Sequence, residues 1–133
     1  MKYCVDTWFL LELFRNTEKA SRIFKETIEG KNKLVIPTIS ILELIRLSIR
    51  TGEKLSKVES MLNELKVSQK VQVIVLDEAI AKEAAKVSVS YNISTVDSII
   101  AATCKISECD KLLSKDDDLV GLAKKKYLKI ENW

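Results

Sequence analysis

Four acidic residues stand where side chains of α/β folds can act together, two of them after strand-like runs and two near the starts of predicted helices. Asp6 directly follows the apolar run 3–5, and Asp116 follows the run 111–114. The carboxyl ends of parallel strands meet at one edge of a sheet, and such folds place their functional groups at that edge. We therefore expect four carboxylates to line one cleft. They belong to Asp6, Glu43, Asp97 and Asp116.

Each acid also has a structural explanation when it is taken alone. Asp6 suits a helix cap, and Asp97 suits the first turn of a helix, where its charge interacts favourably with the helix dipole. The acidic run 116–118 is typical of a turn and cap. Glu43 lies in an apolar segment, and Arg46 three residues later would be its partner on the helix surface. The case for a site therefore depends on the four acids together.

A divalent cation would explain why several carboxylates gather in one place. They repel one another unless they are protonated or neutralised, and oxygen ligands with retained waters suit Mg²⁺ or Mn²⁺. A cation held in this way can generate hydroxide and stabilise an in-line displacement at phosphorus. The chain has no histidine, which excludes Ser-His-Asp and Cys-His catalysis and His-ligated zinc. Without a Walker-type loop or a GxGxxG motif, phosphodiester hydrolysis is favoured over nucleotide binding.

Alternating strand-like and helix-like segments must position these acids. This alternation predicts an α/β fold, with a mainly parallel central sheet and helices on both faces. A chain of 133 residues with 47% hydrophobic residues fits one domain over residues 1–133. We expect strands over 3–5, 34–36, 71–76, 111–114 and 127–130. Helices are expected to begin near Trp8, Thr17, Thr38 or Ser40, Lys54, Asp77, Ser94 and Leu119.

Composition limits the remaining function classes. The net charge of +3 permits a polyanionic partner without being evidence for one. The three cysteines have no CxxC spacing, so Cys4 and Cys104 are expected to pack as small hydrophobic side chains. This usage fits a reducing cytoplasm. No secretory signal or membrane span is expected, because charged residues interrupt the first apolar run and no apolar stretch is long enough.

These motifs resemble the PIN-domain ribonucleases, and most closely the VapC-type toxins of toxin–antitoxin modules. The resemblance begins at residues 5–7, Val-Asp-Thr, and continues with Pro-Thr at residues 37–38 and with Glu43. It includes Asp97 in the segment ISTVDSIIAAT and ends with Ser-Lys-Asp at residues 114–116. Ser98 and Leu119 stand where the family often has Ala and Phe, and both are tolerable in packing.

The resemblance implies a doubly wound sheet of order 3-2-1-4-5 and endoribonuclease activity that depends on Mg²⁺ or Mn²⁺. It also implies a homodimer, and inhibition by a small antitoxin that reaches the acidic cleft. Asp6, Glu43, Asp97 and Asp116 would bind the metal directly or through water, and the substrate would be single-stranded RNA. Asp118 is the second choice for the last acid, and Asp117 is assigned to capping. The hydroxyls of Thr7 and Ser114 would orient a carboxylate or water, and Lys115 would hold the RNA backbone.

Other interpretations remain open from the sequence. A PIN nuclease of RNA processing would carry the same motifs as a toxin, and a PIN scaffold whose acids fail to converge would be inactive. A phospho-acceptor module would use Asp77 after its strand, although Asp6 then lacks an acidic neighbour and Glu43 stays unexplained. The surplus apolar residues of the third and fourth helices predict either burial or an interface, with Leu47 or Leu62 at a subunit or antitoxin contact.

Overall fold

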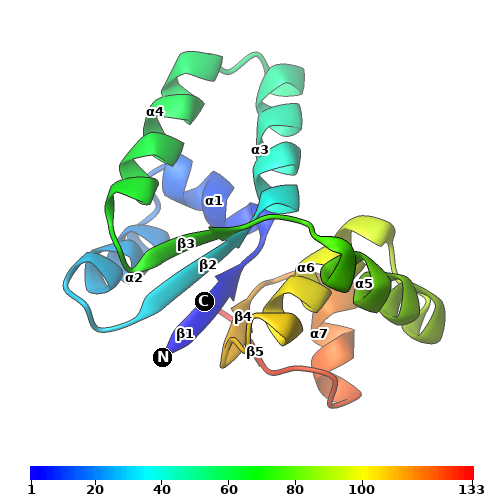
Figure 1. Cartoon of the computed structure of the whole chain (residues 1–133). Helices are drawn as coiled ribbons and strands as arrows, with labels where there is room; N and C mark the ends of the chain where they lie inside the picture. The colour runs from blue at the N-terminus through cyan, green and yellow to red at the C-terminus, as the bar shows by residue number, and fades with distance from the viewer.

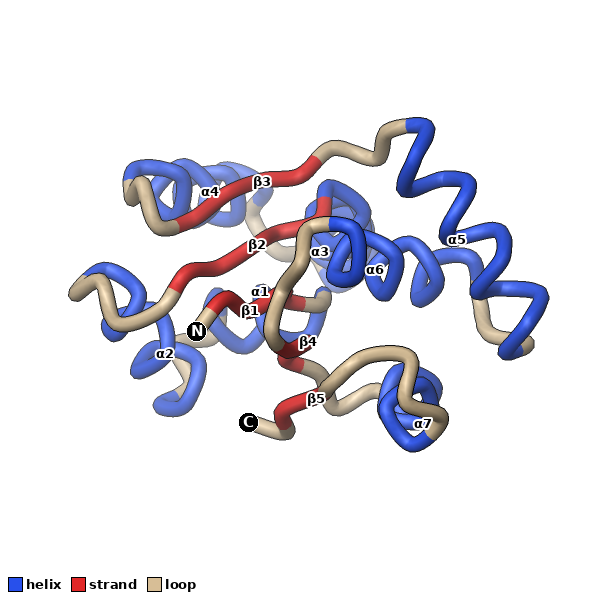
Figure 2. The backbone as a smooth tube through the Cα atoms, turned by 60° about the horizontal axis from the view of Figure 1, so that its bottom comes forward, coloured by secondary structure: helices blue, strands red, loops and turns tan.

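The computed structural model describes residues 1–133 and contains one five-stranded sheet in which every neighbouring pair is parallel. The order is β3-β2-β1-β4-β5, and Figure 2 shows the strands crossing the molecule in this order. The predicted α/β class and strand order are therefore confirmed. The strands are β1 (Lys2–Val5), β2 (Lys33–Pro37), β3 (Val71–Ile74), β4 (Lys111–Leu113) and β5 (Ile130–Glu131).

Seven helices cover the two faces of the sheet. One face packs against α1, α2, α3 and α4, and the other packs against α6 and α7, with α5 lying on α6 (Figure 1). None of them combines the length and the hydrophobicity that a membrane crossing requires. The helices are α1 (Thr7–Phe14), α2 (Glu18–Ile28), α3 (Thr38–Thr51), α4 (Leu55–Val67), α5 (Glu78–Tyr91), α6 (Thr95–Ile106) and α7 (Asp117–Lys124).

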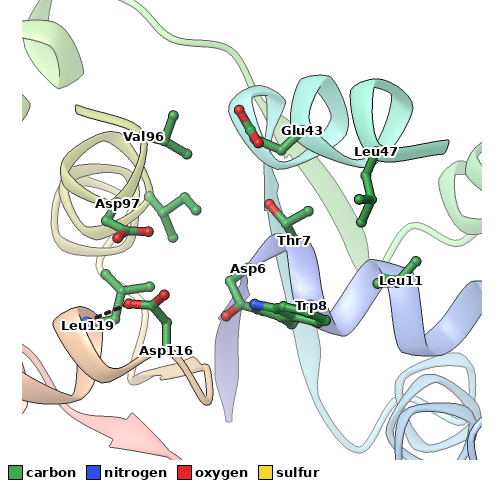
Figure 3. Close-up of a pocket in the computed structure, with 11 residues that line it drawn as sticks. Asp6, Thr7, Trp8, Leu11, Glu43, Leu47, Val96, Asp97, Asp116 and Leu119 are labelled. Atoms are coloured by element: carbon green, nitrogen blue, oxygen red, sulfur yellow. Dashed lines mark hydrogen bonds between the residues drawn. The ribbon is translucent and has the colours of Figure 1, made fainter. Parts of the chain in front are cut away.

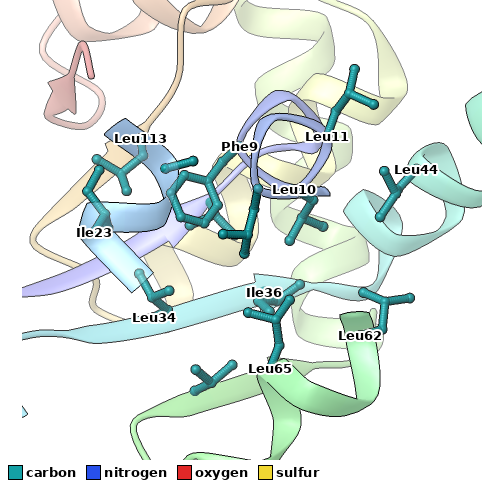
Figure 4. Close-up of a cluster of buried hydrophobic side chains, with 14 of the residues drawn as sticks. Phe9, Leu10, Leu11, Ile23, Leu34, Ile36, Leu44, Leu62, Leu65 and Leu113 are labelled. Atoms are coloured by element: carbon teal, nitrogen blue, oxygen red, sulfur yellow. The ribbon is translucent and has the colours of Figure 1, made fainter. Parts of the chain in front are cut away.

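The central strand, β1, is covered on both faces. Cys4 packs in the cluster that includes α6 and α7, whereas Val5 packs in the opposite cluster with α1. Parallel strands that are buried on both sides are apolar throughout, which explains why the run 3–5 shows no alternation. Phe9 and Leu34 belong to the larger cluster, part of which is shown in Figure 4. This packing fixes the position of the carboxyl end of β1, where Asp6 lies.

The start of α3 differs from the sequence-based expectation. Pro37 occupies the cap position and makes no side-chain cap bond, so neither Thr38 nor Ser40 caps the helix. The Oγ of Ser40 instead donates to the carbonyl oxygen of Val5 at 3.3 Å, and the Oγ1 of Thr38 accepts from the amide of Leu76 at 3.3 Å. Both hydroxyls therefore tie the start of α3 to neighbouring strand ends, which keeps Glu43 close to the end of β1.

Two strands also differ in extent. β3 ends at Ile74, and Val75 and Leu76 leave the sheet with exposed fractions of 65% and 45%. Their β propensity favoured a longer strand, but β2 ends at Pro37, which is the partner of Ile74, and no backbone remains for further pairing. The last strand is Ile130–Glu131, paired with β4, in place of the expected 127–130.

Candidate active site

A cleft opens at the carboxyl edge of the sheet, next to the starts of α1, α3, α6 and α7. Its volume is about 210 Å³. All four predicted acids line it, and Figure 3 shows them around the same space. The acids are joined there by Thr7, Trp8, Leu11, Leu47, Val96, Ile100 and Leu119. Segments that are far apart in the sequence therefore place their carboxylates together.

Asp6 is the most firmly held of the acids. Its side chain is 2% exposed and caps α1, because the amide of Phe9 donates to Oδ1 at 3.0 Å. The Oγ of Ser114 donates to Oδ2 at 2.6 Å. Burial raises the pKa of the carboxyl, and the bonds from Ser114 and Phe9 oppose that rise. These donors hold one orientation of the carboxylate at the end of β1.

Ser114 connects two strand ends. Besides donating to Asp6, its Oγ accepts from the amide of Asp116 at 3.1 Å. The expectation that this hydroxyl orients a carboxylate therefore agrees with the geometry. Thr7 also lines the cleft, but its hydroxyl makes no hydrogen bond to a carboxylate. An orienting role for Thr7 stays a prediction.

Asp97, Asp116 and Asp118 form the closest group of acids. A carboxylate oxygen from each lies within 4.8 Å of the others. The Oδ1 of Asp116 accepts from the amides of Asp118 and Leu119 at 2.9 and 3.2 Å, so this side chain is the cap of α7. Its second oxygen, Oδ2, is left for a cation. Three carboxylate groups at this spacing match the oxygen ligands that Mg²⁺ and Mn²⁺ prefer.

The assignment of the consecutive aspartates changes in one respect. Asp116, expected to be a ligand, is also the cap, whereas Asp117 is an exposed first-turn residue and not the cap. Asp118 joins Asp97 and Asp116, which suits its place as the second choice. The sequence could not separate these roles, because each residue of the run suits a helix start.

Asp97 carries the clearest electrostatic signal in the cleft. Its amide donates to the Oγ of Ser94, the cap of α6, at 3.2 Å. Burial and, next, the negative charge of Asp116 raise the pKa of Asp97 from 3.8 to about 6. A bound cation would relieve this repulsion between neighbouring carboxylates.

The metal-free protein is expected to lose stability as the pH rises from 3.8 to about 6, the interval between the ordinary and the folded pKa of Asp97. The folded state binds the proton more tightly in this interval, so its advantage disappears as Asp97 ionises. Allowing for partial exposure, the loss is about 1 kcal/mol. Urea unfolding in EDTA at several pH values measures it, and Asp97→Asn should show a flatter profile. Equal slopes for both proteins would contradict the assignment.

Glu43 lies on the opposite side of the cleft from this group. It is half-buried on α3, and its Oε1 pairs with Arg46 at 3.7 Å. Glu43 therefore borders the cleft and also has its helix partner, and its role as a metal ligand stays a prediction. Lys115 does not line the cleft. Its Nζ pairs with Glu12 at 3.2 Å and lies 4.3 Å from the centre of the Trp133 ring.

Several apolar residues of the cleft were not expected there. Trp8 is 51% exposed at its edge, and Leu47 lines it from α3. Helical spacing assigns such residues to a core, and only the packing of α1 against α3 reveals that they border a cavity. Leu62 is 7% exposed in the core, so it is not available for an interface. The exposed apolar residues of α3 are Leu42 and Ile49.

Comparisons with known proteins place this arrangement in a family. The sequence matches the PIN domain over residues 3–125. None of the curated proteins matches it in sequence.

Similar solved structures share the fold at low sequence identity. VapBC2 from Rickettsia felis, bound to a promoter DNA fragment, has a TM-score of 0.77 at 15% identity and covers 100% of this chain and 99% of that chain. VapBC-1 from nontypeable Haemophilus influenzae has a TM-score of 0.68 at 20% identity, covering 100% and 98%. The Sarcin-Ricin loop cleaving toxin VapC20 from Mycobacterium tuberculosis has a TM-score of 0.69 at 17% identity, covering 90% and 93%.

Proposed function

Because the chain belongs to the PIN-domain family, we propose that it is an endoribonuclease that hydrolyses single-stranded RNA with Mg²⁺ or Mn²⁺. The observation that carries this proposal is the group formed by Asp97, Asp116 and Asp118, whose carboxylate oxygens lie within 4.8 Å of one another. Asp6 and Glu43 border the same cleft. The donors are all carboxylate oxygens, which fits a hard divalent cation and no soft one.

The residues of the cleft have different roles in this proposal. Asp97 and Asp116 would hold the cation, with Asp118 as a third ligand and with Asp6 and Glu43 acting directly or through water. A cation held there would supply activation of water and stabilisation of charge at the scissile phosphate. Ser114 fixes the orientation of Asp6 through its 2.6 Å bond. The ammonium of Lys115 contacts the RNA backbone, which makes binding dependent on salt.

The biological setting in this proposal is a toxin–antitoxin pair in the cytoplasm. The names of similar structures support it, since they describe VapBC proteins and a Klebsiella pneumoniae toxin–antitoxin complex. The whole of residues 1–133 would act as one nuclease domain, in a homodimer that an antitoxin inhibits. The exposed Leu42 and Ile49 of α3 offer apolar surface for such contacts. Expression that stops growth, and recovery when an upstream antitoxin gene is added, would separate a toxin from an RNA-processing enzyme.

The arrangement of the acids favours this proposal over the alternatives from other function classes. Asp77, the phospho-acceptor candidate, caps α5 by accepting from the amide of Ile80 at 2.9 Å and lies outside the cleft. An inactive scaffold was expected only if the acids failed to converge, and they line one cleft.

The direct test is cleavage of single-stranded RNA by the purified protein. Cleavage is expected with Mg²⁺ or Mn²⁺, is lost in excess EDTA, and returns when Mn²⁺ exceeds the chelator, because the carboxylates alone repel the phosphate. Denaturing gel analysis of an end-labelled oligonucleotide measures the rate. Cleavage that persists undiminished in EDTA would show that the metal mechanism is wrong.

Ser114→Ala is expected to reduce cleavage about tenfold and to lower the free energy of unfolding by about 1–3 kcal/mol, because the buried Asp6 loses a hydrogen bond. The matched control is Ser48→Ala, since Ser48 is also buried and donates within α3 to the carbonyl of Leu44 at 2.8 Å. Chemical unfolding and the RNA assay compare the two variants. If Ser48→Ala reduces cleavage as much, the effect on Asp6 is not specific.

A further inference from the structure

All three cysteines of the chain come together on the α6 side of the sheet. Cys4 lies in β1, Cys104 near the end of α6, and Cys109 in the turn before β4, with their sulfur atoms within 4.8 Å of one another. All three are free thiols. Packing as small hydrophobic side chains explains the buried Cys4 and Cys104, as expected from the sequence. It does not explain why Cys109, which is only half-buried, points its sulfur at the other two.

Backbone pairing and hydrogen bonds position the three thiols. Cys4 lies in the central strand, between Val35 of β2 and Leu112 of β4. The amide of Cys109 donates to the carbonyl of Cys104 at 3.0 Å, which folds the chain back at the end of α6. The turn requires a positive φ of 55° at Glu108. Ligands held on packed elements in this way need little rearrangement to bind a metal.

The spacing is suitable for one cation among three sulfurs. Metal–thiolate bonds of about 2.3 Å place three sulfurs about 4.0 Å apart around a trigonal centre. The upper limit of 4.8 Å in this structure needs only small side-chain movements to reach that value. No carboxylate or imidazole belongs to the group, so its donors are entirely soft.

The surroundings of the three cysteines let a cation reach them and offset the negative charge of their thiolates. A cavity of about 570 Å³ reaches Cys104 and Cys109, and its charged lining is Lys105, Lys126 and Lys129 with one acid, Asp110. Three thiolates around a monovalent cation carry net negative charge, which nearby lysines offset. Cys109 is half-buried and lines this cavity, whereas Cys4 and Cys104 are buried. A cation that enters the cavity therefore reaches the sulfur of Cys109 most directly.

We propose that Cys4, Cys104 and Cys109 form a three-sulfur site for a soft, thiophilic cation, with copper(I) as the occupant. Thiolates select such cations, and copper(I) accepts three ligands, whereas structural zinc sites in proteins almost always have four. The site differs in chemistry from the carboxylate cleft and does not depend on the proposed nuclease activity. The two sites share two elements. β1 carries Cys4 and leads to Asp6, and α6 carries Cys104 and begins near Asp97.

Anaerobic titration of the fully reduced protein with copper(I), in competition with the chelator bathocuproine disulfonate, tests the proposal. We expect one copper(I) per chain, and X-ray absorption of the complex should show three sulfur neighbours at about 2.3 Å. Cys109→Ser should lower the affinity about 100-fold or more, whereas Asp97→Asn, in the other site, should leave it unchanged. Circular dichroism confirms that both variants are folded.

The proposal is overturned if reduced protein with three titratable thiols does not compete with the chelator. It is also overturned if the bound copper has fewer than three sulfur neighbours, or if Cys109→Ser binds as tightly as the wild type. Formation of a disulfide without copper binding by the reduced protein would identify a redox pair instead. If Cys109→Ser does not fold, the sulfur count in the wild-type complex decides the question without it.

Discussion

Asp97→Asn is expected to reduce RNA cleavage by about 100-fold or more while the protein stays folded. Asparagine keeps the shape of the side chain but removes one charge from the closest group of acids, which also contains Asp116 and Asp118. The metal-free variant should be as stable as the wild type or more stable, because burial and repulsion raise the pKa of Asp97 to about 6. Cleavage rates and thermal melts in EDTA measure both effects.

A purely structural role for Asp97 predicts the opposite effect of Asp97→Asn on stability. Loss of a first-turn helix charge would cost roughly 0.3–1 kcal/mol, and α6 would become less stable in EDTA. Asp77→Asn is a matched control, since Asp77 also stands at a helix start but lies outside the cleft. It should cleave RNA at the wild-type rate. Lower stability of Asp97→Asn in EDTA, together with full activity, would contradict its place in the site.

Local patterns in the sequence were sufficient to predict the framework of the fold. Short apolar runs followed by Asp6 or by residues 114–116 marked strand ends, and a parallel sheet brings such ends together. The caps Asp77 and Ser94 were also predicted from their residue types, and both accept the expected backbone hydrogen bonds. These features depend on residues close in the chain or on a rule common to all parallel sheets.

Features that depend on distant contacts could not be predicted. The bond from Ser114 to Asp6 joins residues that are 108 positions apart, and no local pattern specifies that distance. The end of β3 depended on where its partner strand stopped, and the burial of Leu62 depended on how α4 packs. The three cysteines illustrate the same limit, because spacing alone gave no metal motif whereas the fold places their sulfurs together.

The carboxylate cleft and the cysteine cluster share β1 and α6 but prefer different classes of cation. Oxygen donors at the end of β1 and the start of α6 suit hard divalent cations, and sulfur donors at Cys4 and Cys104 suit soft ones. A stability measurement with different cations therefore reports on each site separately. This separation makes the response to Mn²⁺ a specific probe of the cleft.

Mn²⁺ is expected to stabilise the wild-type protein by about 2.7 kcal/mol at 100 times its dissociation constant, because a ligand that binds only the folded state shifts the unfolding equilibrium. Asp116→Asn should gain much less, since the Oδ2 of Asp116 is one of the proposed ligands. Its Oδ1 caps α7 through the amides of Asp118 and Leu119, and the asparagine carbonyl can keep that role. Any loss of stability in EDTA should therefore be small. Thermal melts of both proteins with EDTA and with increasing Mn²⁺ give the comparison. Equal gains for the variant and the wild type would exclude Asp116 from the metal site and move the assignment to Asp118.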